Sequence, residues 1–332
     1  MMKVVIAGFG TVGQGVSEVI GSRQALFETL GQKINIVGAF DSSSIISGNN
    51  LDPYRLVEKK KATGKVGDKT IDDNITQFIA ETDFDILLDT TPTNIEDAEP
   101  GLTYILTALN AGKHVITSNK GPLALKFNTL AKAAADNHVQ LKYEASVGGA
   151  MPIINLCKQL LAGENIESLR GILNGTCNFI LNRMKEEGLP FYQALREAQD
   201  LGYAEADPTY DIDGIDSAAK VAILANAIFG MNVNYYDVVR SGIRNITEDA
   251  IALAAEENSV IRLIGEIGNG KLEVAPRLVP VGHPLSIGGT QNVANIITDL
   301  AGEVTIAGRG AGRKETASAM LSDLISVIQE TR

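Results

Sequence analysis

The fold is decided by the stretch Lys3-Val-Val-Ile-Ala-Gly-Phe-Gly-Thr-Val-Gly13, in which an apolar run leads into three spaced glycines. Valine and isoleucine then recur at helical spacing, at positions 12, 16, 19 and 20. A strand, a glycine turn and a helix in this order are typical of dinucleotide-binding folds, where the glycines permit a tight turn, the approach of a pyrophosphate and close helix packing. The alternative is an ordinary strand-to-helix turn. We expect a dinucleotide site formed by Gly8, Phe9, Gly10, Thr11, Val12 and Gly13.

Strands and helices continue to alternate along the first part of the chain. We expect strands at 34–40, 86–92, 114–120 and 140–144, helices at 102–111 and 123–137, and loop over most of 48–75. This alternation predicts an α/β fold with a doubly wound parallel sheet of Rossmann type. Such sheets bind ligands at the carboxyl ends of their strands. The polar residues expected there are therefore candidate cofactor contacts: Asp41, Thr90, Thr91 and Ser118.

Asp41 bears on the choice of dinucleotide. An acidic residue at the end of the second strand normally accepts a hydrogen bond from the ribose 2′-hydroxyl and selects NAD. Three serines follow it, however, and with the lysines at positions 59–61 they offer a setting for the 2′-phosphate of NADP. A lysine run is more often a solvated face. The sequence favours NAD and leaves NADP open.

The pattern changes beyond residue 140. Longer blocks of helices and strands follow, and Gly268-Asn-Gly270 between two apolar runs predicts a hairpin. We therefore expect a second, α+β domain with a mostly antiparallel sheet, which also offers a plausible surface for a homodimer.

An acidic run before a single lysine is the most unusual feature of this second part. Glu205, Asp207, Asp211, Asp213 and Asp216 precede Lys220. The segment 216–229 lacks proline and internal glycine, is almost wholly apolar or alanine, and stops at a glycine, which predicts a buried helix. Asp216 and Lys220 share one face of it because they are four residues apart. The pair is either an ion pair at a helix start or a tuned proton-transfer group.

The same run carries a resemblance to a known family. Ala198-x-x-x-Gly202-Tyr-Ala, followed by Asp207-Pro-x-x-Asp211-Ile-x-Gly214-x-Asp216-x-x-x-Lys220, resembles the signature of homoserine dehydrogenases. Ser118-Asn-Lys-Gly121 and Asn174-Gly-Thr-Cys-Asn178 are also similar to motifs of that family. The resemblance spans nearly the whole chain. It implies the NAD(P)-dependent interconversion of L-homoserine and L-aspartate 4-semialdehyde, in the biosynthesis of threonine, methionine and isoleucine. We expect the short form, without an aspartate kinase or a C-terminal regulatory domain.

The resemblance also implies roles for individual residues. Lys220 is expected to be the acid/base group, assisted by Lys120, because the hydroxyl must lose a proton as its carbon loses a hydride. Carboxylates are needed for the substrate ammonium, and the expected substrate contacts are Glu205, Asp216, Asp211 and Thr176. Gly202, Gly312 and Lys120 are expected near the cofactor. The chain is expected to divide into a nucleotide-binding domain at 1–140, rejoined by 308–332, and a catalytic and dimerisation domain at 141–307.

A cation site is expected in the stretch Tyr143-Glu-Ala-Ser-Val-Gly-Gly-Ala-Met-Pro152. Its glycine pair lets carbonyl groups turn towards one point, and oxygen-only ligands suit hard cations. The stretch also reads as a hinge between domains, and both descriptions are compatible. By resemblance, Na⁺ or K⁺ would be held by Glu144 and the carbonyl groups of Val147, Gly149 and Met151.

Composition limits the possible partners. A net charge of −11 over 332 residues argues against nucleic acid and anionic membranes. No apolar run reaches the roughly 18–20 residues of a membrane span, and no secretory signal is expected. With two cysteines, we expect reduced, buried thiols in a cytoplasmic protein.

Two other functions compete with this interpretation. One is another two-domain amino-acid dehydrogenase on the same nucleotide fold, such as a semialdehyde-forming relative. A phosphorylating aldehyde dehydrogenase would need a nucleophilic cysteine with a base, and Cys177 has no base nearby in sequence. The other is a non-catalytic NAD-sensing protein, which leaves the acidic run before Lys220 unexplained.

Overall fold

The structure, a computed structural model, describes residues 1–70 and 74–331. It divides into two compact units, one made of Met1–Ser146 with Gly312–Arg332 and the other of Val147–Ala311. The domain limits expected from the sequence, at 140/141 and 307/308, stay a prediction. Each unit has its own sheet and its own helices, and each is described by itself.

The first unit is built on a sheet in the strand order β4-β3-β2-β1-β5-β6-β7. The parallel strands are β1 (Met2–Ala7), β2 (Ile34–Phe40), β5 (Ile86–Asp89), β6 (His114–Thr117) and β7 (Leu141–Lys142). The edge strands β3 (Ser44–Leu51) and β4 (Lys69–Thr70) are antiparallel. The central strands are buried along almost their whole length, as expected of a parallel sheet with helices on both faces. The Rossmann-type sheet is confirmed, with an antiparallel edge that the sequence did not predict.

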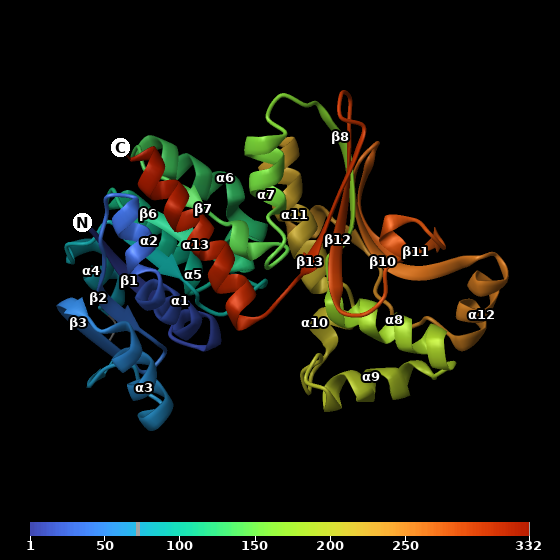
Figure 1. Ribbon diagram of the computed structural model, residues 1–332, viewed down its shortest axis with the longest axis horizontal. Coiled ribbons are helices and arrows are strands. Elements are labelled where there is room, and N and C mark those ends of the chain that lie inside the picture. The colour runs from blue at the N-terminus through green and yellow to red at the C-terminus, as the bar shows by residue number, and fades with distance from the viewer. Residues whose placement is uncertain (71–73, 332) are drawn as a thin grey trace. The chain divides into compact units, whose positions relative to one another are not determined.

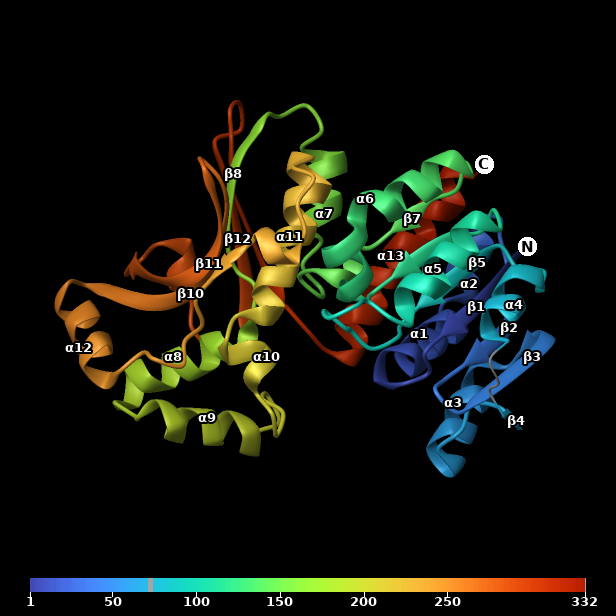
Figure 2. The ribbon, with the colours of Figure 1, turned by 180° about the vertical axis from the view of Figure 1, so that it is seen from behind.

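The helices of this unit cover the two faces of its sheet, and the last helix of the chain is one of them. Helix α13 packs beside α1 (Figure 1), while α4, α5 and α6 lie together on the opposite face (Figure 2). Apolar residues of α13 therefore join the same core as β1 and β5. The helices are α1 (Thr11–Ser22), α2 (Gln24–Thr29), α3 (Pro53–Thr63), α4 (Ile75–Glu81), α5 (Gly101–Asn110), α6 (Lys120–Asp136) and α13 (Arg313–Glu330).

The loop expected over most of 48–75 is wrong in its first part. Strand β3 extends to Leu51, and α3 follows directly. Asp52 caps α3 by accepting hydrogen bonds from the N–H groups of Tyr54 and Arg55, and Gly64 ends it with φ of +73°. The helix was missed because few of its residues are apolar, although aspartate before proline is a readable start signal. The part of the prediction that falls on residues 71–73 lies outside the described residues.

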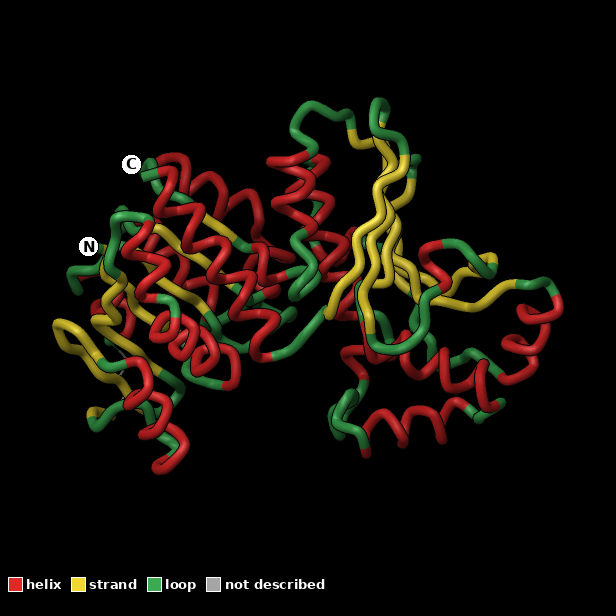
Figure 3. The backbone as a smooth tube through the Cα atoms, viewed as in Figure 1, coloured by secondary structure: helices red, strands yellow, loops and turns green. Residues whose placement is uncertain are grey.

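The second unit holds a sheet in the order β13-β12-β8-β10-β11-β9. Its long strands run side by side (Figure 3). All neighbouring pairs are antiparallel except β11 with β9, so the mostly antiparallel sheet is confirmed. The strands are β8 (Ile166–Ile172), β9 (Val239–Arg240), β10 (Ser259–Gly268), β11 (Lys271–Pro280), β12 (Gln291–Thr298) and β13 (Glu303–Arg309). The predicted hairpin joins β10 to β11.

Helix α11 (Ile215–Phe229) is the buried helix of this unit, as the sequence predicted. Every residue from Asp216 to Asn226 is buried, because α11 packs against β10 and β11. Gly230 ends it with φ of +61°. The other helices are α7 (Ile153–Asn155), α8 (Gly175–Glu187), α9 (Phe191–Asp200), α10 (Thr209–Ile212) and α12 (Glu248–Glu256), with the π-helical turn η2 (Leu156–Leu160) and the 3₁₀ turns η3 (Tyr235–Asp237) and η4 (Pro284–Ser286).

Candidate active site

The glycine turn after β1 has the geometry of a phosphate-binding loop. Gly8 has φ of +79°, and a Cβ on Gly13 would lie 2.2 Å from the carbonyl oxygen of Gly8, so both positions require glycine. A Cβ on Gly10 would meet nothing within 4 Å, which leaves room for a ligand. Gly10 is also the N-cap of α1, and no side chain caps the helix there. The free N–H groups of the first turn suit a pyrophosphate.

The predicted cofactor contacts of the first unit gather at the carboxyl ends of its strands. Thr90 follows β5, and its hydroxyl donates hydrogen bonds to the carbonyl groups of Ala7 and Gly8. Ser118 follows β6, and its N–H donates to the carbonyl of Asp89 at 3.0 Å. Lys120 is the first residue of α6, which is capped by Asn119. The glycine turn and the loops after β5 and β6 therefore form one polar edge of the sheet.

Asp41 lies at the same edge, after β2, with its carboxylate engaged inside the protein. It accepts hydrogen bonds from the N–H and hydroxyl groups of Ser43 and Ser44, and from the N–H of Val66. Lys60 donates to its second oxygen at 2.8 Å. Burial raises the pKa of Asp41, but the hydrogen bonds from Lys60 and Ser43 outweigh burial and hold the pKa below its usual range. Asp41 is therefore an ionised carboxylate paired with a cation.

In the second unit, Lys220 lies at the centre of a buried hydrogen-bond network. Its ammonium donates to Asp216 at 2.7 Å, one turn earlier on α11, and to the carbonyl of Leu173 after β8 at 2.6 Å. Asn174 donates to Asp216 at 3.0 Å and to Asp211 at 2.7 Å. The lysine is 7% exposed. The described network leaves the third hydrogen of the ammonium for another acceptor.

Asp211 and Cys177 share this environment. Burial and the charge of Asp216 raise the pKa of Asp211, while the amide of Asn174 opposes the rise. The Cys177 thiol is fully buried and donates to the carbonyl of Asp211, and burial raises its pKa well above the usual range. Cys177 thus packs as a neutral thiol rather than a nucleophile.

Three other predicted residues lie around the C-terminal end of α9. Glu205 is exposed, and in the described part of the chain its carboxylate makes no hydrogen bond or ion pair. The Thr176 hydroxyl donates to the carbonyl of Tyr203 at 2.8 Å. Gly202 has φ of +75° and directly follows Leu201, the C-cap of α9. The structure thus joins Asp216 to Lys220 directly, connects Asp211 to them through Asn174, and leaves Glu205 outside that network.

Sequence reasoning missed two residues of the network. Asn174 was quoted as part of a motif but not as a site residue, although its amide links both aspartates. Asn292 of β12 is fully buried and donates to the carbonyl of Leu173 at 3.1 Å. Strand β12 gives no sequence signal for this contact, because it depends on the pairing of β12 with β8.

The predicted cation ligands lie in a stretch with unusual backbone geometry. Gly148 and Gly149 have φ of +85° and +57°, and the N–H of Met151 donates to the carbonyl of Gly148. Glu144 is buried, and its backbone N–H donates to the carboxylate of Asp323 of α13 at 2.9 Å. Within the described ranges, three or more His, Cys, Asp or Glu side chains nowhere cluster to hold a metal. The predicted ligand set, one carboxylate and three carbonyl groups, does not depend on such a cluster.

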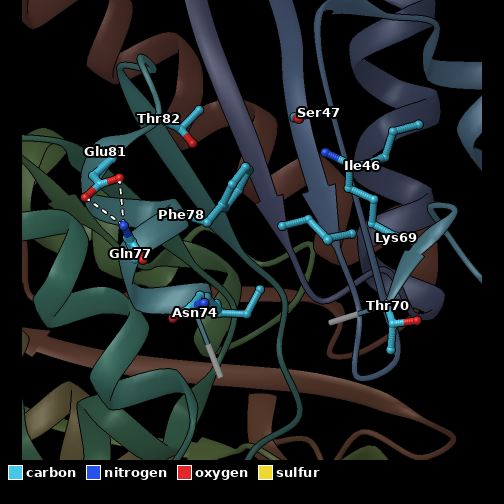
Figure 4. A pocket seen from close by; sticks show the side chains of 11 residues that line it. Ile46, Ser47, Lys69, Thr70, Asn74, Gln77, Phe78, Glu81 and Thr82 are labelled. Atoms are coloured by element: carbon cyan, nitrogen blue, oxygen red, sulfur yellow. Dashed lines mark hydrogen bonds between the residues drawn. The ribbon is translucent and has the colours of Figure 1, made fainter. Parts of the chain in front are cut away.

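A separate pocket lies at the outer edge of the first unit's sheet. It has a volume of about 380 Å³ and is lined by residues of β3, β4 and α4, among them Ile46, Lys69 and Phe78 (Figure 4). Gln77 and Glu81 hydrogen-bond to each other on its wall. None of the predicted site residues lines this pocket, so it is not part of the candidate active site.

Gly312 precedes α13, and its φ of +140° requires glycine. Its predicted place near the nicotinamide stays a prediction.

Among the described residues, no helix combines the length and apolar character needed to cross a bilayer.

Two family models match the chain. Residues 8–144 match the model described as "Homoserine dehydrogenase, NAD binding domain", and residues 152–325 match "Homoserine dehydrogenase". A homoserine dehydrogenase of Methanocaldococcus jannaschii is 47% identical over the full length of both chains. An NAD(+)-dependent homoserine dehydrogenase of Pseudomonas canavaninivorans is 40% identical and covers 98% of this chain and 96% of its own.

Solved structures of homoserine dehydrogenases are also similar to this chain. The crystal structure of a putative homoserine dehydrogenase of Archaeoglobus fulgidus has a TM-score of 0.92 and 47% identity, and covers 99% of both chains. A hyperthermophilic archaeal homoserine dehydrogenase in complex with NADPH has a TM-score of 0.87 and 32% identity, and covers 99% of this chain and 98% of its own.

Proposed function

Because the chain belongs to the homoserine dehydrogenase family, we propose that Lys220 exchanges a proton with the substrate oxygen. The chain is an NAD(P)-dependent oxidoreductase that interconverts L-homoserine and L-aspartate 4-semialdehyde in the biosynthesis of threonine, methionine and isoleucine. The observation that supports Lys220 is its surroundings. It is a buried ammonium held by Asp216 and a backbone carbonyl, with one hydrogen left for a substrate oxygen.

The proton and the hydride move together in this proposal. When bound, the nicotinamide accepts the hydride from the alcohol carbon of homoserine. Neutral Lys220 then takes the hydroxyl proton, and in the reverse direction the ammonium returns it to the aldehyde oxygen. Asp216 stabilises the charged form of Lys220 and fixes its direction. Lys120 is proposed to orient the same oxygen.

The substrate ammonium needs carboxylates that are not already neutralised. Asp216 shares one oxygen between Lys220 and Asn174, so we propose that it contributes to the substrate site mainly through Lys220. Asp211, and Glu205 from its exposed position, are proposed to meet the ammonium directly. Thr176 is proposed as a further substrate contact.

The dinucleotide is proposed to bind along the polar edge of the first unit's sheet. The uncapped start of α1 and the open space at Gly10 support a pyrophosphate there. Asp41 is proposed to face the ribose, with Thr90, Thr91 and Ser118 beyond it, and Gly202 and Gly312 are proposed to lie near the cofactor. Because Asp41 stays ionised, NAD remains the favoured dinucleotide.

Three further assignments are proposals. Na⁺ or K⁺ is proposed to bind Glu144 and the carbonyl groups of Val147, Gly149 and Met151, and turnover with and without these ions tests it. A homodimer is supported by exposed apolar side chains on and beside β9 and β11, such as Tyr236, Val239 and Leu278, and the mass in solution tests it. Two buried cysteines that form no disulfide within the described residues support a cytoplasmic location, which cell fractionation tests.

The assignment of Lys220 is tested by turnover of Lys220→Met with homoserine and either NAD⁺ or NADP⁺. We expect turnover to fall by roughly 10²–10⁴-fold, with cofactor affinity unchanged. Lys132→Met is the matched control, because Lys132 pairs with Asp136 on the surface. Near-normal turnover of Lys220→Met would remove this residue from the acid/base role.

A further inference from the structure

Asp89 is a fully buried carboxylate at the centre of the first unit that none of the proposed roles uses. It ends β5, between Ala7 of β1 and Thr117 of β6. One oxygen accepts hydrogen bonds from the N–H and the hydroxyl of Thr91, at 3.1 and 2.6 Å. The other accepts from the hydroxyl of Thr117 at 2.7 Å. The carboxylate thus joins the loops that follow two neighbouring strands.

Both threonine hydroxyls also accept hydrogen bonds from Asn119. The N–H of Asn119 donates to the Thr117 hydroxyl at 3.0 Å, and its side-chain amide donates to the Thr91 hydroxyl at 2.9 Å. The amide oxygen of Asn119 accepts from the N–H of Gly121 at 3.0 Å and so caps α6, which begins at Lys120. A chain of hydrogen bonds therefore connects Asp89 to the start of the helix that carries Lys120.

The directions of these hydrogen bonds fit an ionised Asp89. Each threonine hydroxyl gives its single hydrogen to the carboxylate and uses its oxygen to accept from Asn119. A proton on Asp89 would aim a second donor at one of these oxygens and leave the hydrogen of that threonine without its acceptor. In a buried site such a mismatch is costly, so the chain of hydrogen bonds would rearrange.

We propose that Asp89 is a positioning residue that must be ionised to hold the loops after β5 and β6 in the arrangement that binds the dinucleotide. The inference rests on the proposed cofactor contacts Thr90, Thr91, Ser118 and Lys120, which those loops carry. Asp89 itself touches neither cofactor nor substrate in this proposal.

The surroundings of Asp89 bring its pKa into the pH range in which binding can be measured. Burial raises its pKa to about 6, against the lowering effect of the hydrogen bonds from Thr91 and Thr117. Its strand neighbours Ala7 and Thr117 do not ionise. From α5, Tyr104 faces it, and burial, the charge of Asp89 and that of Glu99 raise the pKa of Tyr104. No lysine or arginine of the described ranges forms an ion pair with Asp89.

The test measures NADH affinity of the full-length chain by fluorescence titration between pH 5 and pH 8. NADH is the probe because the 2′-phosphate of NADPH titrates near pH 6 itself. We expect wild-type affinity to fall about tenfold from pH 7 to pH 5, since one proton opposes binding. Asp89→Asn should bind weakly at all these pH values, without this dependence.

Thr117→Val gives a second, independent readout. It removes a hydrogen bond that lowers the pKa of Asp89, so the fall in affinity should begin at a higher pH than in wild type. Thr107→Val is the matched control, because among the described residues its hydroxyl bonds only to the Thr103 carbonyl within α5. It should follow the wild-type profile.

A wild-type pH dependence in Asp89→Asn would overturn the proposal. If that variant does not fold, an unshifted profile in Thr117→Val overturns it equally. Failure of the Lys220 assignment is distinguishable, because Lys220→Met alters turnover and leaves the pH dependence of NADH binding untouched.

Discussion

At the scale of single residues, Lys60 forms an ion pair with Asp41, the residue proposed to face the ribose of the cofactor. The two side chains are 21% and 6% exposed, and the ammonium and the carboxylate are 2.8 Å apart. A free carboxylate favours the 2′-hydroxyl of NAD and repels the 2′-phosphate of NADP. Pairing with Lys60 offsets the negative charge of Asp41, so it weakens both the preference for the 2′-hydroxyl and the repulsion of the 2′-phosphate.

Lys60→Met should therefore increase the preference for NAD⁺. We expect the ratio of kcat/KM with NAD⁺ to that with NADP⁺ to rise about tenfold, which corresponds to about 1.4 kcal/mol. Steady-state kinetics with both cofactors measure it. Lys61→Met is the control, because Lys61 faces Glu18 instead and is well exposed. An unchanged ratio in Lys60→Met would mean that the pair does not reach the ribose.

At the scale of elements, the turn between β1 and α1 contains glycines that the fold itself requires and one, Gly10, that borders the space proposed for the pyrophosphate. A Cβ at Gly13 would lie 2.2 Å from the carbonyl of Gly8, so α1 would have to move away from β1. A Cβ at Gly10 meets nothing within 4 Å, and φ of −80° there is open to alanine.

Two alanine variants should therefore behave differently. Gly13→Ala should lower the free energy of unfolding by about 1–3 kcal/mol and weaken dinucleotide binding. Gly10→Ala should keep wild-type stability and still lose at least about tenfold in affinity, because its methyl group occupies the space proposed for the pyrophosphate. Urea unfolding and NADH titration measure the two effects. Equal stability losses in both variants would contradict this division.

Comparison of predicted and observed elements shows which of them a local sequence pattern can predict. Helix α11 and strand β2 were predicted nearly to the residue, because burial gives them continuous apolar runs between clear stop signals. Helix α3 was missed because its exposed residues carry no apolar stripe. Residues 153–160 form a single α-turn followed by a π-helical turn, a distinction that apolar spacing does not encode.

At the scale of the whole molecule, the first unit is built from two separate parts of the chain, because α13 belongs to it. Helix α13 packs against α1, and Leu324 lies 2% exposed in the core shared with Ile6 and Leu88. The core of the first unit is therefore incomplete without α13.

Leu324→Ala should destabilise the first unit selectively. Loss of a buried leucine side chain costs about 2–5 kcal/mol. Amide hydrogen exchange should accelerate in β1 and β5 and stay near wild type in β10 of the second unit. Leu300→Ala is the control, because that side chain is 77% exposed. Equal acceleration in β10 would show that the effect of α13 is not confined to the first unit.

The sequence by itself determined the alternation of strands and helices in most of the first unit, the glycine turn and the signature that ends at Lys220. These features depend on neighbours a few residues apart, through helical spacing, strand alternation and backbone freedom. Only the tertiary structure decided that the carbonyl of Leu173 meets Lys220, 47 residues away, and that Asp89 connects the loops after β5 and β6. Those contacts depend on which strands lie side by side, and strand order is set by the packing of the whole sheet rather than by any local pattern.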